Sequence, residues 1–248
     1  QQNSIELIIA IGGGSVIDMA KLIKALYGNH NSAKEIIQGA LPISNNSIPL
    51  IAIPTTAGSG SESTHFAVVY VSKDKYSLAD LSLLPSSTIL DGALTLSASR
   101  YQKACNVLDA VSQSIESAWA VNATIESQKY SFEALDLCIK YSQKYVNSDN
   151  PIEYCQPMIE ASNLAGKAIN ISKTTAAHAW SYALSSKYNI PHGHAVWLTL
   201  PKIFEIHNST KINNLEKTMT KLRKILLINS GNDIQEYFNT FLKSLGIK

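Results

Sequence analysis

The pattern of apolar residues changes once along this chain, close to residue 95, and this change limits what the chain can fold into. Before it, short apolar runs bounded by glycine-rich or polar segments predict an amphipathic helix at about residues 15–27 and four strands, at residues 6–11, 49–54, 66–71 and 87–91. The first run is continuous, as in a strand buried on both faces of a parallel sheet. Residues 1–95 are therefore expected to form an α/β domain whose parallel sheet is incomplete in this chain.

After residue 96 the apolar residues recur at helical spacing instead. This spacing predicts helices at about residues 101–119, from 122 or 124 to 146, and at 151–171, 174–186, 193–206, 214–228 and 233–245. Pro201 is expected to bend one of them. Residues 96–248 are therefore expected to form an all-helical domain. Because the chain starts almost directly on a strand and its last helix has no clear stop signal, we expect a fragment truncated at both ends.

Charge and cysteine content argue against several classes of protein. The net charge is +2 over 248 residues, which gives no electrostatic argument for binding nucleic acid or an anionic membrane. The three cysteines form no CxxC pair and lie in apolar helical patterns, as buried thiols do. The sequence has neither a signal-peptide pattern nor a membrane-spanning run. These features predict a cytoplasmic protein that binds neither a membrane nor a nucleic acid.

Two loops rich in small residues each follow an apolar strand. The first, Gly12, Gly13, Gly14 and Ser15, joins a strand to a helix, where free N–H groups and the helix dipole favour an anion such as a phosphate. The second, residues 55–64, carries hydroxyls that suit phosphate, ribose or a carboxamide. Taken alone, the first loop could also be an ordinary tight turn between strand and helix, and the second could also be a flexible surface loop. Together they favour a crevice that binds a dinucleotide.

A second group of polar residues lies in the helical part and has the composition of a metal site. Asp109 and Gln113 are four residues apart, which places both side chains on one face of a helix. His178 and His192 follow fourteen residues apart. Two imidazoles, a carboxylate and an amide oxygen suit a divalent metal such as Zn²⁺ or Fe²⁺. His194, two residues further on, either reaches the substrate as a catalytic group or caps its helix.

The order of these motifs resembles the iron-containing, or group III, alcohol dehydrogenases. The matching stretches are GGGS-x-x-D-x-A-K, TTAGSGSE-x-T, D-A-x-x-Q, AAH and PHG, spread over roughly residues 6–208. The resemblance implies an enzyme with an N-terminal dinucleotide-binding domain and a C-terminal helical domain, with metal and substrate between them. It implies an oxidoreductase that interconverts a small aldehyde and its alcohol with NAD or NADP.

The resemblance also assigns residues. It implies that Asp109, Gln113, His178 and His192 fill the four metal-ligand positions, and that Asp18 orders the glycine-rich loop. It further implies that the cofactor is contacted by Gly12, Gly13, Gly14, Ser15, Thr55, Thr56, Ser59, Ser61 and, near the ribose, Lys75. A preceding segment in the family reads the ribose 2′-hydroxyl, so NAD and NADP stay open here. A homodimer stays open as well.

Two positions depart from the family pattern, and other stretches point to one branch. Gln113 stands where histidine is common, which weakens the argument for iron specifically, and Tyr182 stands where a histidine is often found. The stretches DAVSQSIES, AAHAWSYALS and PHGHAV resemble the branch that reduces phosphonoacetaldehyde to 2-hydroxyethylphosphonate, a step of phosphonate metabolism. The alternatives are an enzyme like glycerol dehydrogenase or dehydroquinate synthase, and a non-catalytic truncated domain.

Overall fold

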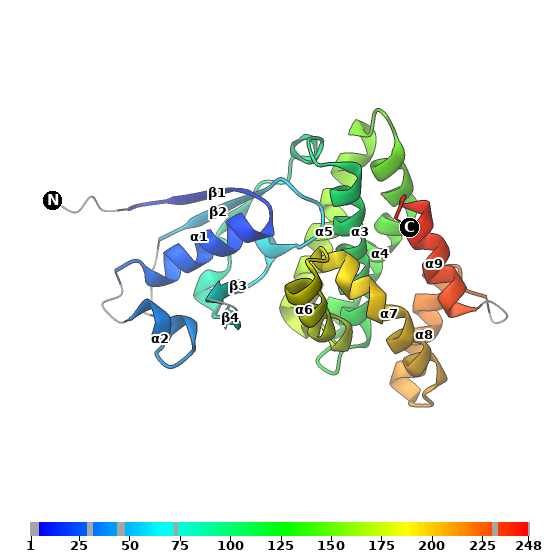
Figure 1. The fold of residues 1–248 in the computed structure, drawn as a ribbon. Helices are drawn as coiled ribbons and strands as arrows, with labels where there is room; N and C mark the ends of the chain where they lie inside the picture. Colours follow the sequence, from blue (N-terminus) through cyan, green and yellow to red (C-terminus); the bar gives the residue numbers. More distant parts are fainter. Residues whose placement is uncertain (1–4, 29–31, 44–47, 72–73, 230–232, 248) are drawn as a thin grey trace.

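The computed structural model of the protein describes residues 5–28, 32–43, 48–71, 74–229 and 233–247. An α/β part and a helical part lie side by side, and the chain passes from one to the other through the short 3-10 helix η3 (Gly92–Thr95) (Figure 1). This architecture confirms the predicted fold class. In the described parts of the chain, no helix is both long and apolar enough to cross a membrane.

The α/β part is built on a short parallel sheet with the strand order β1-β2-β5. Strand β1 (Ile8–Gly12) pairs in parallel with β2 (Leu50–Pro54), which pairs with the two-residue strand β5 (Ser87–Thr88). Helix α1 (Gly14–Leu26) follows β1 directly and buries Ile17 completely against the sheet. Because β1 and β2 are parallel neighbours, the loops that follow them leave the sheet at the same edge.

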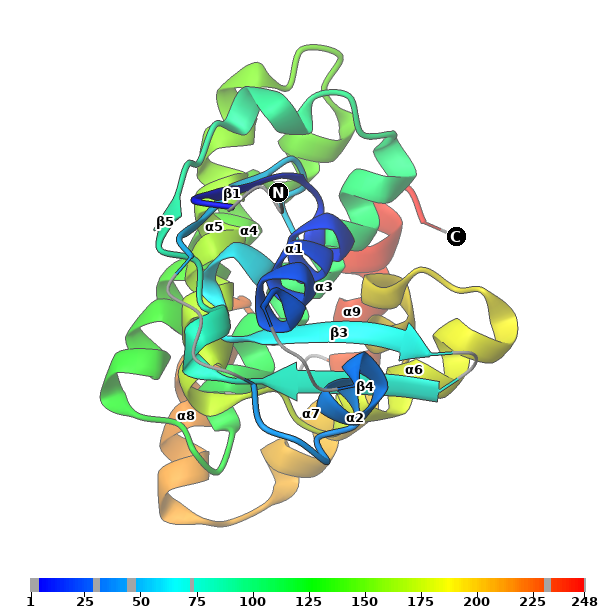
Figure 2. The same ribbon diagram turned by 90° about the vertical axis from the view of Figure 1, so that its left-hand side faces the viewer.

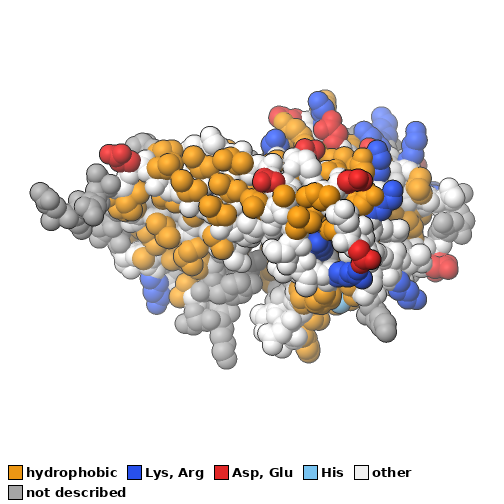
Figure 3. All heavy atoms as spheres, turned by 90° about the horizontal axis from the view of Figure 1, so that it is seen from above, with side chains coloured by type: hydrophobic (Ala, Val, Ile, Leu, Met, Phe, Trp, Pro, Cys, Tyr) orange, Lys and Arg blue, Asp and Glu red, His pale blue; other side chains and the backbone are white. Residues whose placement is uncertain are grey.

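Strand β1 is not buried on both faces, in contrast to the prediction from its continuous apolar run. Ile9 is 55% exposed and Ile11 is 60% exposed. Helix α1 covers only one side of the strand, and β1 is the edge strand of this sheet. The exposed side continues onto α1 through Val16, Met19 and Ile23, and Figure 3 shows hydrophobic side chains gathered over this part of the molecule. We call these five residues the β1 face.

Two elements of the α/β part were not predicted. Strand β4 (Asp74–Ala79) pairs antiparallel with β3 (Phe66–Val71), so the third predicted strand belongs to a hairpin rather than to the parallel sheet (Figure 2). The five-residue helix α2 (Ala33–Ile37) packs near this hairpin. Both are too short and too polar to show a clear period, and packing against α1 through residues such as Leu22 and Leu78 stabilises them.

The helical part contains the predicted helices with small shifts at their ends. They are α3 (Arg100–Trp119), α4 (Ile125–Asn147), α5 (Ile152–Ser172), α6 (Ala176–Tyr188), α7 (His192–Ser209), α8 (Asn213–Ile225) and α9 (Ile234–Ser244). Thr124, not Asn122, caps α4, and it forms a capping box with Ser127. Helix α7 continues through Pro201. Helix α3 is buried along most of its length, so the polar residues that it carries are enclosed.

The loop after β2 packs directly on the helical part. A Cβ atom on Gly60 would lie 2.5 Å from the Cα atom of Gly166 in α5, and one on Gly58 would lie 2.8 Å from Asn106 in α3. The 3-10 helix η1 (Ser61–Ser63) follows, and the buried Asn163 of α5 donates to Glu62 at 3.1 Å. This close contact sets the loop beside the polar face of α3.

Candidate active site

The two glycine-containing loops lie against each other at the carboxyl ends of β1 and β2. A Cβ atom on Gly14 would lie 2.6 Å from the Oγ atom of Ser59, and one on Gly13 would lie 3.3 Å from Thr56. The N–H of Thr55 donates to the carbonyl of Gly12 at 3.0 Å. The absence of side chains at the first turn is therefore what allows the second loop to approach it.

The first turn of α1 has backbone N–H groups that no side chain caps, and such groups can bind an anion. Gly13 is the N-cap residue and provides no side-chain cap, and Ser15 in the first helical turn is exposed. The early N–H groups of a helix lack partners within the helix and carry its positive end, which favours phosphate. Ser15, Thr55, Thr56 and Ser59 all lie around this turn, as expected for cofactor contacts, and only a bound cofactor tests that role.

A buried network beneath the loops orders them. The Asp18 carboxylate accepts hydrogen bonds from the Ser61 hydroxyl at 2.5 Å and from the N–H of Val68 at 3.0 Å. These bonds hold the end of the second loop, and a role of Asp18 in ordering the glycine-rich turn stays a prediction. Lys21 is fully buried and donates to Ser61, Thr64 and the carbonyl of Phe66. Burial lowers the pKa of Lys21 to about 8, against the opposing charge of Asp18.

Of the residues assigned to the cofactor, Ser61 is buried beneath the loop, and the side chain of Lys75 is not described. Ser61 is 6% exposed, and its hydroxyl is engaged by Asp18 and Lys21, so it belongs to the network beneath the loop rather than to the surface of the crevice. Lys75 lies in β4 opposite Tyr70, and its side chain is outside what the structure describes. A contact between Lys75 and the ribose stays a prediction.

The predicted metal ligands converge from three helices. Asp109 of α3, His178 of α6 and His192 of α7 each provide one ligand atom, and these atoms all lie within 4.8 Å of one another. The Oδ1 atom of Asp109 is 3.3 Å from Nε2 of His178 and 3.9 Å from Nε2 of His192. Two ligand atoms on one tetrahedral ion lie roughly 3.4 Å apart, given metal–ligand distances near 2.1 Å. The three side chains therefore fit a divalent metal.

The role of Gln113 as the fourth ligand stays a prediction, because it is the amide NH2 group of Gln113 that donates toward Asp109. The Nε2 atom of Gln113 also donates to the carbonyl of Ser59 at 3.2 Å. Its Oε1 atom is buried and has no hydrogen-bond partner among the described residues. A buried acceptor without a partner is costly, and a cation would satisfy it. The hydrogen bond from Gln113 to Ser59 joins α3, the helix that carries Asp109, to the loop beside the glycine-rich turn.

Without a metal, the charged groups of the site are paired with one another. Burial alone would raise the pKa of Asp109, but the neighbouring His192 and His178 outweigh it and hold that pKa below its ordinary value. Burial alone would lower the pKa of His178, yet the Glu116 carboxylate and the bond to Asp109 raise it to about 9. The site is therefore a cluster of paired opposite charges rather than a patch of unpaired carboxylates.

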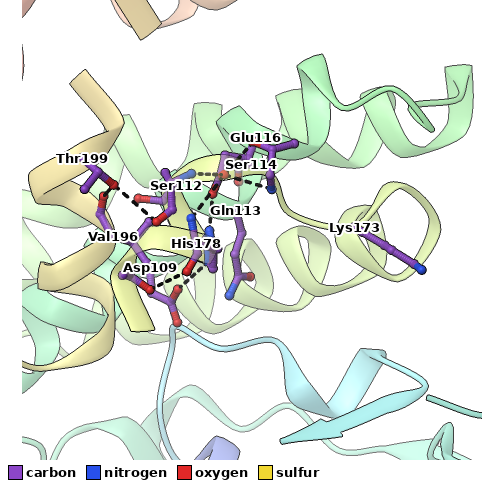
Figure 4. Close-up of polar contacts among 12 residues, drawn as sticks. Asp109, Ser112, Gln113, Ser114, Glu116, Lys173, His178, Val196 and Thr199 are labelled. Carbon is purple, nitrogen blue, oxygen red and sulfur yellow. Dashed lines mark hydrogen bonds and ion pairs between the residues drawn. The ribbon is translucent and has the colours of Figure 1, made fainter. Parts of the chain in front are cut away.

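Glu116 is a polar residue of this cluster that the sequence analysis did not single out. It is fully buried in α3 and contacts Nδ1 of His178 (Figure 4). It lies seven residues after Asp109 and three after Gln113, which places all three on one helix face. That spacing was visible in the sequence, but the partner of Glu116 is 62 residues away.

The remaining side chains near the ligand motifs bring little positive charge to the site. His194 is half-buried and contacts the hydroxyl of Tyr101 at 3.2 Å, and burial lowers its pKa. Tyr182 stacks on the ring of His192. Arg100 pairs with Asp149 on the surface, and Figure 4 shows Lys173 pointing away from the metal ligands. His192 itself has the Ser181 hydroxyl 3.4 Å from its Nδ1 atom.

The comparisons with known proteins cover both parts of the chain. A family model described as iron-containing alcohol dehydrogenase matches residues 1–92, and one described as Fe-containing alcohol dehydrogenase family, C-terminal, matches residues 103–248. The chain is 35% identical over 202 residues to probable alcohol dehydrogenase EutG of Escherichia coli, an alignment covering 81% of this chain and 51% of that protein.

Two further relatives bear on chemistry. Phosphonoacetaldehyde reductase of Streptomyces viridochromogenes is 32% identical over 213 residues, or 82% of this chain and 54% of that protein. The crystal structure of sulfoacetaldehyde reductase from Bifidobacterium kashiwanohense in complex with NAD+ matches with a TM-score of 0.87 at 29% identity, covering 98% of this chain and 64% of that one. The chain spans about half the length of the curated relatives it matches.

Proposed function

Because the chain belongs to the iron-containing alcohol dehydrogenase family, we propose that the protein of which it is part interconverts a small aldehyde and its alcohol with NAD or NADP. The observation that carries this proposal is the hydrogen bond from Gln113 to Ser59. This bond places the cluster of Asp109, His178 and His192 beside the loop that packs on the glycine-rich turn. A dehydrogenase needs this proximity, since hydride passes only between groups in contact.

The residues of the chain have separate tasks in this proposal. Asp109, His178 and His192 would hold a divalent metal, with the free Oε1 atom of Gln113 as the fourth donor. When bound, the metal supplies a Lewis acid that polarises the substrate oxygen. The first turn of α1 would hold the pyrophosphate of the nicotinamide cofactor through backbone N–H groups. The protein itself mainly orients the two reactants.

The substrate we propose is a short aldehyde with an anionic head group, of which phosphonoacetaldehyde is one. Two of the relatives are named as reductases of phosphonoacetaldehyde and of sulfoacetaldehyde, which share that chemistry. In this chain His194 is the group we assign to the head group, because it lies two residues beyond His192 and its hydrogen-bond partner among the described residues is Tyr101. Its lowered pKa means that it would act as a neutral N–H donor.

The test is a comparison of two aldehydes on the full-length protein. Oxidation of NADH and NADPH is followed with phosphonoacetaldehyde and with butanal, and the expected result is a far higher kcat/KM for the phosphonate. The change His194→Ala should narrow that difference mainly through the phosphonate substrate. Equal turnover of the two aldehydes would contradict the substrate class and leave the dehydrogenase activity standing.

A second measurement tests the metal site separately. His192→Ala should remove most of the bound metal, as determined by elemental analysis, and should reduce kcat/KM by more than the roughly 10–100-fold that loss of an outer partner of a ligand costs. His65→Gln is the matched control, because His65 contacts Asn170 and is not a member of the cluster. Full metal content in His192→Ala would exclude this site. No observation favours the non-catalytic domain or a dehydroquinate synthase-like reaction over this proposal.

A further inference from the structure

His178 is held between two buried carboxylates, only one of which belongs to the candidate metal site. Its Nε2 atom faces Asp109 at 3.3 Å, and its Nδ1 atom contacts Oε2 of Glu116 on the opposite side of the ring (Figure 4). Glu116 is fully buried, whereas the side chain of His192 is 42% exposed. The ring of His178 is therefore the more constrained of the two imidazoles.

The second oxygen of Glu116 holds the helix on which His178 lies. Its Oε1 atom accepts from the N–H of Thr175 at 2.9 Å, from the hydroxyl of Thr175 at 2.6 Å and from the N–H of Ala177 at 3.1 Å. Thr175 is the N-cap residue of α6 but provides no side-chain cap of its own. The carboxylate of Glu116 thus replaces the missing cap from a different helix.

We propose that Glu116 is the positioning residue of the metal site: it fixes the orientation and the tautomer of His178 and couples them to the start of α6. A carboxylate accepts only, so Nδ1 of His178 must carry the proton that faces Glu116. Nε2 faces the Asp109 carboxylate, so a metal bound there would replace the proton on Nε2 while Nδ1 keeps its proton toward Glu116, and the negative charge of Glu116 would strengthen Nε2 as a donor. This inference rests on the metal site of the proposed function.

The competing explanation is that Glu116 only caps α6, and a glutamine separates the two roles. An amide has one accepting end, so Glu116→Gln cannot satisfy both sides. Four donors face Oε1 and one faces Oε2, so the amide oxygen should stay with α6 and the NH2 group should face His178. That group favours the tautomer with the proton on Nε2, which cannot bind a metal.

Two more variants remove the remaining ambiguity. Glu116→Asp keeps the negative charge but shortens the side chain, so it tests whether charge alone suffices. Thr175→Val removes one hydroxyl donor from the α6 cap and leaves the contact between Glu116 and His178 intact. His192→Ala reports whether the metal lies at this site at all.

The experiment measures the Kd for Zn²⁺ of the metal-free full-length protein by competition with a chelator, together with the thermal unfolding of each metal-free variant. Glu116→Gln and Glu116→Asp should each raise the Kd by about 10–100-fold, the usual cost of losing such a partner. Thr175→Val should lower the unfolding temperature and leave the Kd within about twofold of the wild type, since its contact lies outside the bond to His178.

Each other outcome overturns the inference in an identifiable way. An unchanged Kd in Glu116→Gln, with metal lost in His192→Ala, means that the site exists but Glu116 does not position it. If the affinity for Zn²⁺ falls in Glu116→Gln but not in Glu116→Asp, the negative charge at position 116 matters and the positioning of His178 does not. If Thr175→Val weakens Zn²⁺ binding as much as Glu116→Gln does, Glu116 acts only by capping α6. If His192→Ala binds Zn²⁺ as tightly as the wild type, the metal site of the proposed function is itself wrong.

Discussion

Gln113 is the residue at which this chain departs most clearly from its family's usual ligand set. An amide oxygen is a neutral and harder donor than an imidazole, so it should bind Fe²⁺ or Zn²⁺ less tightly. Since position 113 lies one helical turn after Asp109 on the same face of α3, Gln113→His should lower the Kd for either ion at least about tenfold, or 1.4 kcal/mol, in the full-length protein. The Kd is measured by chelator competition.

The control for this change is Gln143→His, an exposed glutamine on α4 that lies outside the cluster. It should leave the Kd unaltered. If Gln113→His also leaves it unaltered, the side chain at position 113 does not face the metal, and the orphaned Oε1 atom needs a different explanation.

At the scale of elements, two glycines allow two helices to reach their sites. A Cβ atom on Gly193, in the first turn of α7, would lie 2.0 Å from the carbonyl oxygen of Cys105 in α3. The carbonyl of Cys105 belongs to the backbone of α3 and cannot move without disturbing that helix. Gly193→Ala should therefore push the start of α7 and His192 away from Asp109. We expect the metal content, measured by elemental analysis, to fall to less than about a tenth, because a ligand displaced by an ångström no longer coordinates.

Gly14 provides the reciprocal control, because its Cβ atom would lie 2.6 Å from Ser59 in the other loop. Gly14→Ala should raise the Kd for the cofactor by at least about tenfold, roughly 1.4 kcal/mol, and leave the metal content intact. Cofactor binding is followed by quenching of protein fluorescence. If both variants lose the same ligand, the two elements are not independent and the division of labour between them is wrong.

At the scale of the whole molecule, the two parts differ in how well they are enclosed. The helical part buries a large continuous core, whereas the β1 face leaves Ile9, Ile11 and Met19 more than half exposed. Exposed apolar patches on an unpaired edge strand favour association. A polypeptide of these 248 residues should therefore self-associate in solution, as measured by light scattering after gel filtration.

Ile11→Lys should reduce that association, since a charged residue on an edge strand opposes pairing. Ile206→Lys is the matched control, because Ile206 is 51% exposed on α7 and distant in the fold from the β1 face. A monodisperse monomer of the unaltered polypeptide would contradict the prediction. The homodimer and the division of the chain at residues 95 and 96 stay predictions.

What the sequence by itself determined is what depends on neighbours along the chain. Helix α3 begins after Ser99 and α9 after Asp233, because each cap side chain accepts from an N–H two or three residues later. The glycine-rich turn and the spacing of Asp109 and Gln113 are local for the same reason. Strand β4 was missed because its six residues have no clear alternating pattern of apolar and polar side chains. Its extended conformation depends on pairing with β3.

Only the tertiary structure decided which distant residues meet. Glu116 contacts His178 across 62 positions, and Gln113 contacts Ser59 across 54. Both contacts depend on how α3 packs against α6 and against the loop after β2, and the close approach of Gly58 to Asn106 fixes that loop on α3. No local propensity encodes such a fit. The sequence therefore identified candidate ligands, and the packing of the helices brings Asp109, His178 and His192 together.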